Sequence, residues 1–310
     1  MLNASLRYFA AIARHGSIRE AADELHVAQS ALSRQILKLE EYFGVPLFER
    51  HARGVKLTSA GEIFLRYARS NLRQIERVSS ELDALKGLRR GTVKIQSIES
   101  LVQNLLPVAI ARFRERHPGV TFDVTIDTTD RVIAAVREGR ADIGLVFYPP
   151  VESDLTTAFK VNEPLVAVMS ADHPLARRDR LSLADSMSYP VALPMQHSGA
   201  RMLIDIACKA AGIHLTPSLE TNSIQLRVRF VHASLGITFL TRLTVWDGVR
   251  SGDLVAVSLR DRIVNSASID AVTLSTRHLP IAAEEFVHLL QHELQGLKES
   301  PRKQPRGPRQ

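Results

Sequence analysis

The first part of the chain places apolar side chains at the intervals of two short α-helices. Leu6 and Phe9 begin a run at three- and four-residue spacing over about residues 3–14, which gives a first helix one apolar face. A glycine ends that helix, and Ser17 with Glu20 three positions later has the spacing of a capping box. The pattern therefore predicts a helix, a tight stop and a second short helix.

A third helix is predicted from about Ala28 to Phe43, and its two faces differ. Leu32, Ile36 and Leu39 form an apolar stripe on one side. The other side carries hydrogen-bonding groups and cations without a carboxylate: Gln29, Ser30, Ser33, Arg34 and Lys38. Gln pairs well with adenine, Arg with guanine and Ser with either base. The arrangement is typical of a helix-turn-helix that enters a DNA major groove, with a helical hairpin whose polar face is solvated as the alternative.

Two short extended runs follow the third helix, at residues 45–50 and 51–57. They flank a basic, glycine-containing turn, as the two strands of a β-wing do. Arg50, Arg53 and Lys56 on this wing would contact the DNA backbone or reach toward the minor groove. Phosphate contacts of this kind give affinity without sequence information.

Residues 6–62 resemble the DNA-binding domain of LysR-type transcriptional regulators. The match runs continuously through GS-x-x-x-AA, Q-S-x-x-S-x-x-I-x-x-LE, LF-x-R and LT-x-AGE. The resemblance implies that the polar helix face and the wing hold DNA-contact positions, namely Gln29, Ser30, Ser33, Arg34, Arg50 and Arg53. Many members of the family have Pro where this chain has Ser30, a departure that leaves the interpretation intact.

A long fourth helix is predicted after the wing. Ser59 and Glu62 have capping-box spacing, and no Pro or Gly then occurs until Gly87. An apolar seam runs along the helix at Phe64, Ala68, Leu72, Ile75, Ser79 and Leu82. The resemblance implies that this linker helix pairs with its copy in a second subunit, as a homodimer or homotetramer. Packing on its own chain alone is the alternative.

Beyond Gly91 the pattern changes to alternating strands and helices, which predicts an α/β region with mainly parallel sheets. Strands are expected at 92–97, 120–126, 142–147, 164–169, 190–193, 236–240, 254–258 and 269–275. Helices are expected at 101–116, 130–138, 201–211, 224–233 and 281–296. The resemblance, weaker here, implies two α/β subdomains like those of a periplasmic binding protein.

The expected fold class is therefore α+α/β, with an N-terminal winged helix-turn-helix, a long linker helix and a two-subdomain effector domain. The boundaries are 1–58 for the DNA-binding domain, 59–87 for the linker and 88–299 for the effector-binding domain. Within the last, subdomain I takes about 91–163 and 268–299, and subdomain II about 164–267. Residues 300–310 form a basic, proline-rich tail that we expect to be disordered.

Ligands of open α/β sheets bind at the carboxyl ends of strands and against helix N-termini. That rule selects eight candidate effector contacts: Ser97, Ser100, Thr128, Thr129, Phe147, Ser198, Arg201 and Asn222. The resemblance implies effector contacts for Ser100 and Thr129, although each hydroxyl has a helix-capping alternative. Hydroxyls and amides favour a carboxylate, hence a small organic acid or aromatic metabolite, but Glu99 would repel an anion if it points inward.

Charge is distributed unevenly along the chain. Residues 1–90 contain 15 Lys or Arg against 10 Asp or Glu, residues 91–299 contain 21 against 23, and residues 300–310 contain four against none. The excess of positive charge at the ends favours double-stranded DNA as the partner of the first part. The predicted location is the bacterial cytoplasm, on the nucleoid through DNA binding, with RNA polymerase as a further candidate partner.

Several functional classes lack support in the sequence. No run reaches the roughly 18 apolar residues of a membrane helix, and no signal peptide is recognised. The single Cys208 excludes an intrachain disulfide. There is no G-x-S-x-G, no phosphate-binding loop and no H-E-x-x-H motif around His288 and His292. We therefore expect no enzyme activity, cofactor or metal. A solute-binding protein is the rival for the α/β region, but the helix-turn-helix argues against it.

Overall fold

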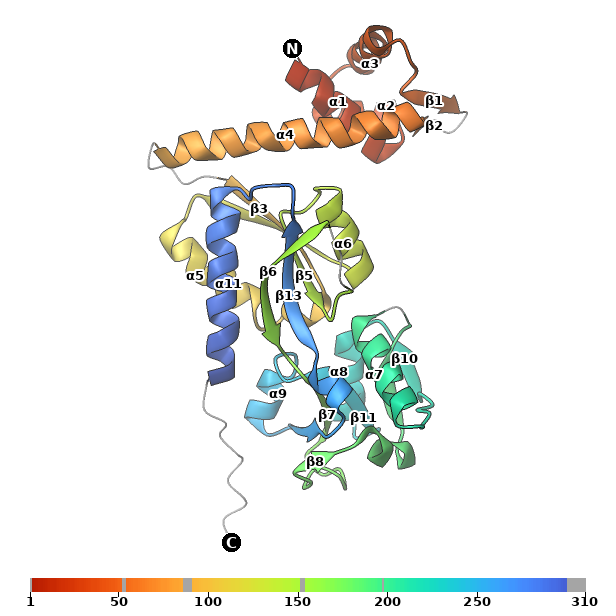
Figure 1. Cartoon of the computed structure of the whole chain (residues 1–310), viewed down its shortest axis with the longest axis vertical. Coiled ribbons are helices and arrows are strands. Elements are labelled where there is room, and N and C mark those ends of the chain that lie inside the picture. Colours follow the sequence, from red (N-terminus) through yellow and green to blue (C-terminus); the bar gives the residue numbers. More distant parts are fainter. Residues whose placement is uncertain (1, 52–53, 86–90, 151–153, 197, 300–310) are drawn as a thin grey trace. The chain divides into compact units, whose positions relative to one another are not determined.

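The computed structural model describes residues 2–51, 54–85, 91–150, 154–196 and 198–299 (Figure 1). The chain divides into two compact units, one on each side of the boundary between Leu88 and Arg89. Each unit has its own hydrophobic core. The predicted combination of a helical N-terminal domain and a larger α/β domain is confirmed.

The N-terminal unit is a winged helix-turn-helix followed by a long helix. Its elements are α1 (Leu2–His15), α2 (Ile18–Leu25), α3 (Gln29–Phe43), β1 (Phe48–His51), β2 (Gly54–Leu57) and α4 (Ser59–Leu85). β1 and β2 pair antiparallel as the predicted wing. Phe9 and Leu32, from the predicted apolar faces of α1 and α3, are fully buried in this core.

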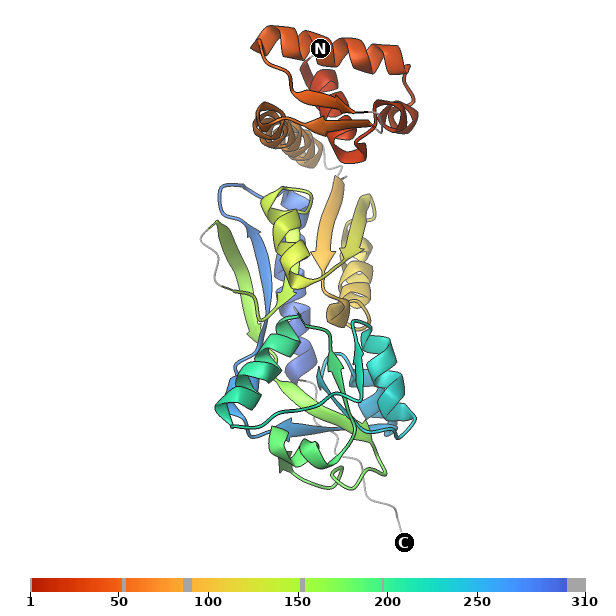
Figure 2. The same cartoon turned by 90° about the vertical axis from the view of Figure 1, so that its right-hand side faces the viewer.

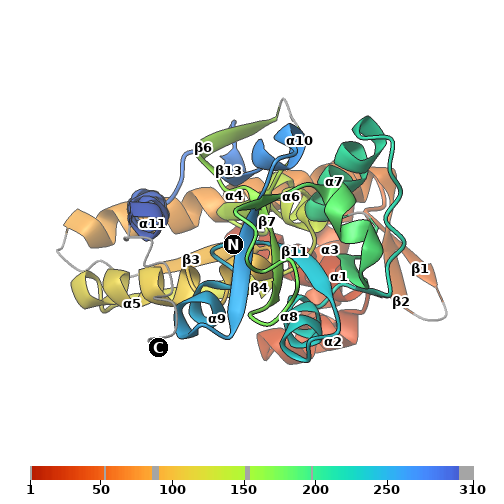
Figure 3. The same cartoon turned by 90° about the horizontal axis from the view of Figure 1, so that it is seen from below.

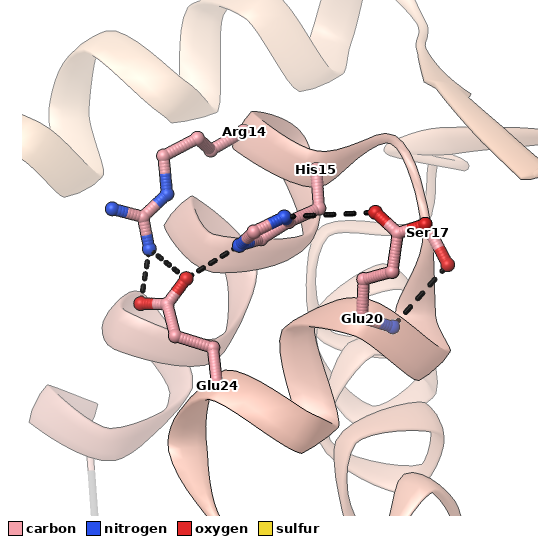
Figure 4. Close-up of polar contacts among 5 residues, drawn as sticks. All are labelled: Arg14, His15, Ser17, Glu20 and Glu24. Carbon is pink, nitrogen blue, oxygen red and sulfur yellow. Dashed lines mark hydrogen bonds and ion pairs between the residues drawn. The ribbon is translucent and has the colours of Figure 1, made fainter.

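The capping box predicted at the start of α2 is half formed. The Ser17 hydroxyl accepts a hydrogen bond from the Glu20 amide at 3.3 Å, but the Glu20 carboxylate lies 3.7 Å from Nδ1 of His15 instead of returning to the cap (Figure 4). Glu24 of α2 accepts hydrogen bonds from His15 and Arg14 at the end of α1. These bonds, that of His15 first, hold the pKa of the Glu24 carboxyl below its usual value. Polar contacts therefore join α1 to α2 beside their shared turn.

The cap of α4 is Thr58, so the prediction of Ser59 was wrong by one residue. The Thr58 hydroxyl accepts from the Gly61 amide at 2.9 Å and donates to the Pro46 carbonyl at 2.8 Å. A Cβ on Gly61 would overlap the Leu47 carbonyl. The start of α4 therefore lies tightly against the segment before the wing, an approach that only glycine permits.

The apolar seam predicted along α4 serves two different purposes. Phe64 and Ala68 are buried in the core of their own unit, and the half-buried Leu72 packs against the same core. Ile75 and Val78 are 45% and 51% exposed. The other two predicted seam positions lie outside the described side chains: Ser79 and Leu82. The predicted seam therefore packs on its own unit in the first half of the helix and is exposed in the described part of the second half.

Subdomain I of the second unit is built on a five-stranded sheet of order β4-β3-β5-β13-β6. The strands are β3 (Gly91–Ser97), β4 (Val120–Ile126), β5 (Ile143–Phe147), β6 (Leu155–Asn162) and β13 (Ser268–Leu274). α5 (Leu106–Arg116) and α11 (Ile281–Glu299) cover one face, and α6 (Thr129–Arg137) covers the other (Figure 1).

Subdomain II is built on a six-stranded sheet of order β10-β9-β11-β7-β12-β8. The strands are β7 (Leu165–Ser170), β8 (Arg180–Leu181), β9 (Val191–Pro194), β10 (Leu219–Thr221), β11 (Ile237–Thr241) and β12 (Leu254–Leu259). Its helices are η2 (Leu183–Ser188), α7 (Gly199–Ala210), α8 (Ile224–His232), α9 (Trp246–Ser251) and α10 (Arg262–Asn265). α7 and α8 pack on opposite faces (Figures 2 and 3).

Both sheets are mainly parallel, as expected, and each also contains one strand that runs against the others. β13 runs antiparallel to β5 and β6, and β7 runs antiparallel to β11 and β12. The chain passes between the subdomains twice, and the two crossing segments are joined by the Glu163 amide and the Ala267 carbonyl at 2.8 Å. A strand that enters a sheet from the other subdomain runs against its neighbours, which the strand and helix pattern does not reveal.

The helix expected at 101–116 begins later than predicted. A 3-10 turn, η1 (Glu99–Leu101), follows β3, and α5 starts at Leu106. Pro107 explains the difference, because proline is accepted in a first helical turn but lacks the amide that a helix interior needs. The pattern also missed β6, an edge strand with alternating exposed positions, and the short elements β8, β10, α9 and α10.

Candidate DNA-binding surface and effector cleft

The polar side of α3 is free of intrachain partners among the described residues. Gln29, Ser30, Arg34 and Lys38 are exposed and Ser33 is half-buried. None of the five side chains makes a hydrogen bond or ion pair within the described part of the chain. The apolar stripe predicted on the opposite side is buried. The helix therefore presents all five predicted DNA-contact residues to solvent without competing interactions.

The N-terminus of α3 adds free backbone donors to that surface. Ala28 occupies the cap position and has no side-chain acceptor for the first amides of the helix. The amides of Gln29 and Ser30 make no hydrogen bond within the described residues. A helix N-terminus with unsatisfied amides attracts phosphate groups. The start of α3 is thus suited to a DNA backbone contact next to the polar face.

A glutamate that the sequence analysis passed over fixes the other end of α3. Glu40 Oε1 accepts hydrogen bonds from the amides of Leu47 at 2.8 Å and Phe48 at 3.1 Å. The signal in the sequence was its position, because a carboxylate is electrostatically unfavourable in the last turns of a helix unless it has another role. Glu40 therefore ties the recognition helix to the chain that enters the wing.

The wing is anchored on the turn between α1 and α2. The Val55 amide donates to the Gly16 carbonyl at 2.8 Å, and a Cβ on Gly54 would overlap that same carbonyl. Arg50 and Lys56 on the two strands are exposed. Arg53 lies outside the described residues. The wing therefore exposes at least two cationic side chains, and it belongs to the same unit as the polar face of α3.

The candidate contacts in subdomain I follow two adjacent parallel strands. Ser97, at the end of β3, is fully buried and its hydroxyl donates to the Ile98 carbonyl at 3.0 Å. Ser100 lies half-buried in η1. After β4, Thr128 is exposed and Thr129 is 6% exposed as the first residue of α6. Because β3 and β4 are parallel neighbours, Ser100 and Thr129 leave the same edge of the sheet.

The candidate contacts in subdomain II are more fully engaged. Ser198 caps α7 by accepting from the Arg201 amide at 3.1 Å. The Arg201 guanidinium, 9% exposed as a residue, donates to Asp205 at 2.9 Å, to Glu220 at 3.0 Å and to the Pro194 carbonyl at 3.0 Å. Arg201 is thus held within its own subdomain.

The two remaining candidates differ in exposure. Asn222 is exposed in the loop before α8. Phe147, at the end of β5, is buried. Gly199 lies so close to the Phe147 backbone carbonyl that a Cβ on Gly199 would overlap it. Phe147 belongs to subdomain I and Gly199 begins α7 of subdomain II. The two subdomains therefore touch backbone to backbone at this point.

Two hydrogen bonds from the segment after β3 also cross between the subdomains. Glu99 Oε2 accepts from the Ile224 amide at 3.0 Å, and Asn104 Nδ2 donates to the Leu243 carbonyl at 2.7 Å. Sequence reasoning did not identify Asn104 at all and considered Glu99 only as a source of repulsion. The segment that carries Ser100 is therefore in polar contact with the second subdomain on both of its sides.

Cys208 should be chemically inert in the folded protein. Its residue is 6% exposed, and burial raises the pKa of the thiol to about 11. Since the thiolate is the reactive form, iodoacetamide at pH 8 should label the native chain at least about a hundredfold more slowly than the chain unfolded in urea. Equal rates in the two states, followed by mass spectrometry, would show that the thiol is accessible and ionised.

The part of the chain that the structure describes offers neither a metal site nor a membrane span. No cluster of three or more His, Cys, Asp or Glu side chains there is arranged to hold a metal ion. No described helix is both long and apolar enough to cross a bilayer.

Comparisons with known proteins agree for both units. A family model described as bacterial regulatory helix-turn-helix protein, lysR family, matches residues 4–62, and one described as LysR substrate binding domain matches residues 86–295. The transcriptional dual regulator GltC of Bacillus subtilis is 36% identical over 240 residues, 77% of this chain and 80% of that protein. A RuBisCO operon transcriptional regulator of Acidithiobacillus ferrooxidans is 30% identical over 255 residues, 82% of each chain.

A solved structure shows the same fold over almost the whole chain. A full-length OxyR variant of Pseudomonas aeruginosa superposes with a TM-score of 0.74 at 21% identity and covers 95% of both chains. The relatives found by sequence are transcriptional regulators rather than enzymes.

Proposed function

Because the chain belongs to the LysR family of bacterial transcriptional regulators, we propose that a small organic acid or aromatic metabolite, bound between its two α/β subdomains, adjusts how it acts on DNA. The protein is a DNA-binding transcriptional regulator with an effector-binding domain. The nature of the effector, the residues that contact it and the residues that read DNA are the content of the proposal. The bacterial cytoplasm as its location and RNA polymerase as a further partner also belong to it.

The observation that carries this proposal is the pair of hydrogen bonds from Glu99 and Asn104 to subdomain II. Glu99 and Asn104 lie next to Ser100 and four residues after it. Their partners, Ile224 and Leu243, belong to subdomain II. A ligand beside Ser100 and Thr129 would have to make or break contacts at this junction. A ligand changes a conformational equilibrium only through such differential contacts.

For DNA, we assign base contacts to the polar face of α3 and backbone contacts to its flanks. Gln29, Ser33 and Arg34 would read base edges in the major groove. Ser30, at the start of the helix, with Lys38 and Arg50 would hold phosphates. Arg53 keeps its sequence-based assignment to the wing. The support is the exposure of the described members of this set and their lack of partners within the described residues.

Self-association is assigned to one face of α4. Four exposed apolar side chains lie at intervals of four, eight and three residues: Ile63, Tyr67, Ile75 and Val78. These intervals keep them on one side of a helix. Exposed apolar side chains grouped in this way mark interaction sites. A homodimer would carry two recognition helices to two half-sites.

The effector assignment can be tested with a ligand screen and one pair of substitutions. Small organic acids and aromatic metabolites are screened against the full chain, and the expected ligand raises the melting temperature because it binds the native state. Ser100→Ala with Thr129→Ala should abolish that rise and leave the affinity for DNA unchanged.

The control for that pair is Thr157→Ala. Thr157 is an exposed residue of the edge strand β6 and is not among the candidate contacts, so its substitution should leave the response to the ligand intact. A full response in the Ser100→Ala, Thr129→Ala variant would place the effector elsewhere in the domain.

A further inference from the structure

The side chain of Glu99 reaches from subdomain I to the start of a helix in subdomain II. Its Oε2 accepts a hydrogen bond at 3.0 Å from the amide of Ile224, the first residue of the nine-residue helix α8. The N-terminus of a helix carries a positive partial charge and free amides, which favour an anion. Ser223 caps the same turn by accepting from the Leu226 amide at 3.2 Å. A carboxylate of the chain itself thus occupies the anion position of α8.

A buried cation lies one turn further along the same helix. Arg227 is 4% exposed, and its Nη1 donates to the Phe239 carbonyl at 3.3 Å. Its Nε is buried and has no hydrogen-bond partner among the described residues. Burial lowers the pKa of Arg227 to about 10, while the negative charge of Glu99 opposes that shift.

A buried guanidinium with an unbonded Nε, such as that of Arg227, destabilises the folded state if no opposite charge is near it. A buried charge destabilises the folded state unless an opposite charge and a full set of hydrogen bonds accompany it. Phe239 supplies one neutral acceptor, and Glu99 supplies negative charge from the other subdomain. The negative charge of Glu99 therefore favours both the amide of Ile224, which it accepts from, and the buried cation of Arg227.

We propose that the first turn of α8 and Arg227 form an anion subsite of the cleft, that Glu99 is its resident anion, and that the carboxylate of an effector enters by displacing Glu99. Displacement of Glu99 by an effector rests on the function proposed above, whereas the subsite does not depend on it. The subsite selects small carboxylates over neutral or cationic molecules. Displacement also breaks a hydrogen bond between the subdomains, which couples occupancy of the subsite to their contact.

The size of the glutamate side chain supplies a direct test. Glu99→Ala removes a CH₂–COO⁻ fragment, which acetate matches in size and charge. The Glu99→Ala chain, full length, should melt at a lower temperature than the wild type. Acetate should then raise its melting temperature with the logarithm of its concentration, by about 2–4 °C at about five times its Kd. Acetamide, of the same shape without the charge, should have no such effect.

The controls separate the subsite from general effects of salt and charge. Ionic strength is kept constant with sodium chloride. The wild type, in which Glu99 fills the subsite, and Glu115→Ala, which removes an exposed glutamate from α5, should show no acetate-specific rise. Glu99→Gln keeps an oxygen for the Ile224 amide but loses the charge, so it should melt between the wild type and Glu99→Ala.

The outcomes are decisive for the subsite. Equal melting temperatures for the wild type, Glu99→Ala and Glu99→Gln would overturn the proposal, as would an equal response of all variants to acetate. If Glu99→Ala does not fold, a lower melting temperature of Glu99→Gln supports the subsite and an unchanged one refutes it. No DNA or effector is present, so failure here leaves the proposed function standing. Likewise, a failed effector screen would leave an acetate-restored subsite intact.

Discussion

Aspartate at both Ile75 and Val78 should convert the protein into a monomer. The two side chains are 45% and 51% exposed and lie three residues apart on one face of α4. In a dimer paired through this face they would be buried, and a carboxylate taken out of water without a partner is strongly destabilising. Sedimentation at micromolar concentration should show a single chain. The affinity for an operator should fall by about 100-fold or more, since a monomer engages one half-site.

The control for this experiment is Val45→Asp. Val45 is also an exposed apolar residue of the N-terminal unit, 43% exposed, but belongs to the segment before the wing and not to α4. It should sediment as the wild type does. Leu72→Ala should behave differently from both, because Leu72 packs on the core of its own unit. It should lower the melting temperature and leave the chain associated. A dimer that persists with aspartate at Ile75 and Val78 would place the interface elsewhere.

Arg34→Ala should weaken binding to a cognate operator by about 1–3 kcal/mol, or roughly 5- to 150-fold, for each base contact that it removes. Arg34 is exposed on the first half of α3 and makes no intrachain bond within the described residues. The substitution therefore disrupts no interaction of the folded unit, and the melting temperature should not change. Gln29→Ala should behave in the same way.

The measurement is a titration of DNA from upstream of the protein's own gene, at several salt concentrations, beside random DNA of equal length. Arg66→Ala is the matched control, since it removes an equally charged, exposed side chain from α4. Both arginine variants should show the steep fall of affinity with salt that phosphate contacts produce. Only Arg34→Ala should reduce the preference for the cognate site. An unchanged preference would refute the assignment of the α3 face to the groove.

The predicted site residues differ in whether the fold already engages their side chains in hydrogen bonds or ion pairs. The α3 face needed only a helix with one buried stripe, and that stripe is buried as predicted. In the effector domain, Arg201 and Ser97 satisfied the same strand-end rule as Ser100 and Thr129. The tertiary structure engages Arg201 with Asp205 and Glu220, and Ser97 with Ile98. Strand-end position therefore selects a region and does not distinguish a free hydroxyl from one already bonded.

The sequence by itself determined the winged helix-turn-helix, the long helix and the α/β order. Each follows from intervals of a few residues, from glycine and proline positions or from continuous motifs. Tertiary structure alone decided which residues meet. Glu99 and Ile224 are 125 positions apart, and Arg112 and Glu293 are 181 apart. Tertiary packing also determined which part of the α4 seam is buried and which strands run against their neighbours. Local periodicity fixes which face of an element is apolar, whereas the partner of that face depends on how distant segments pack.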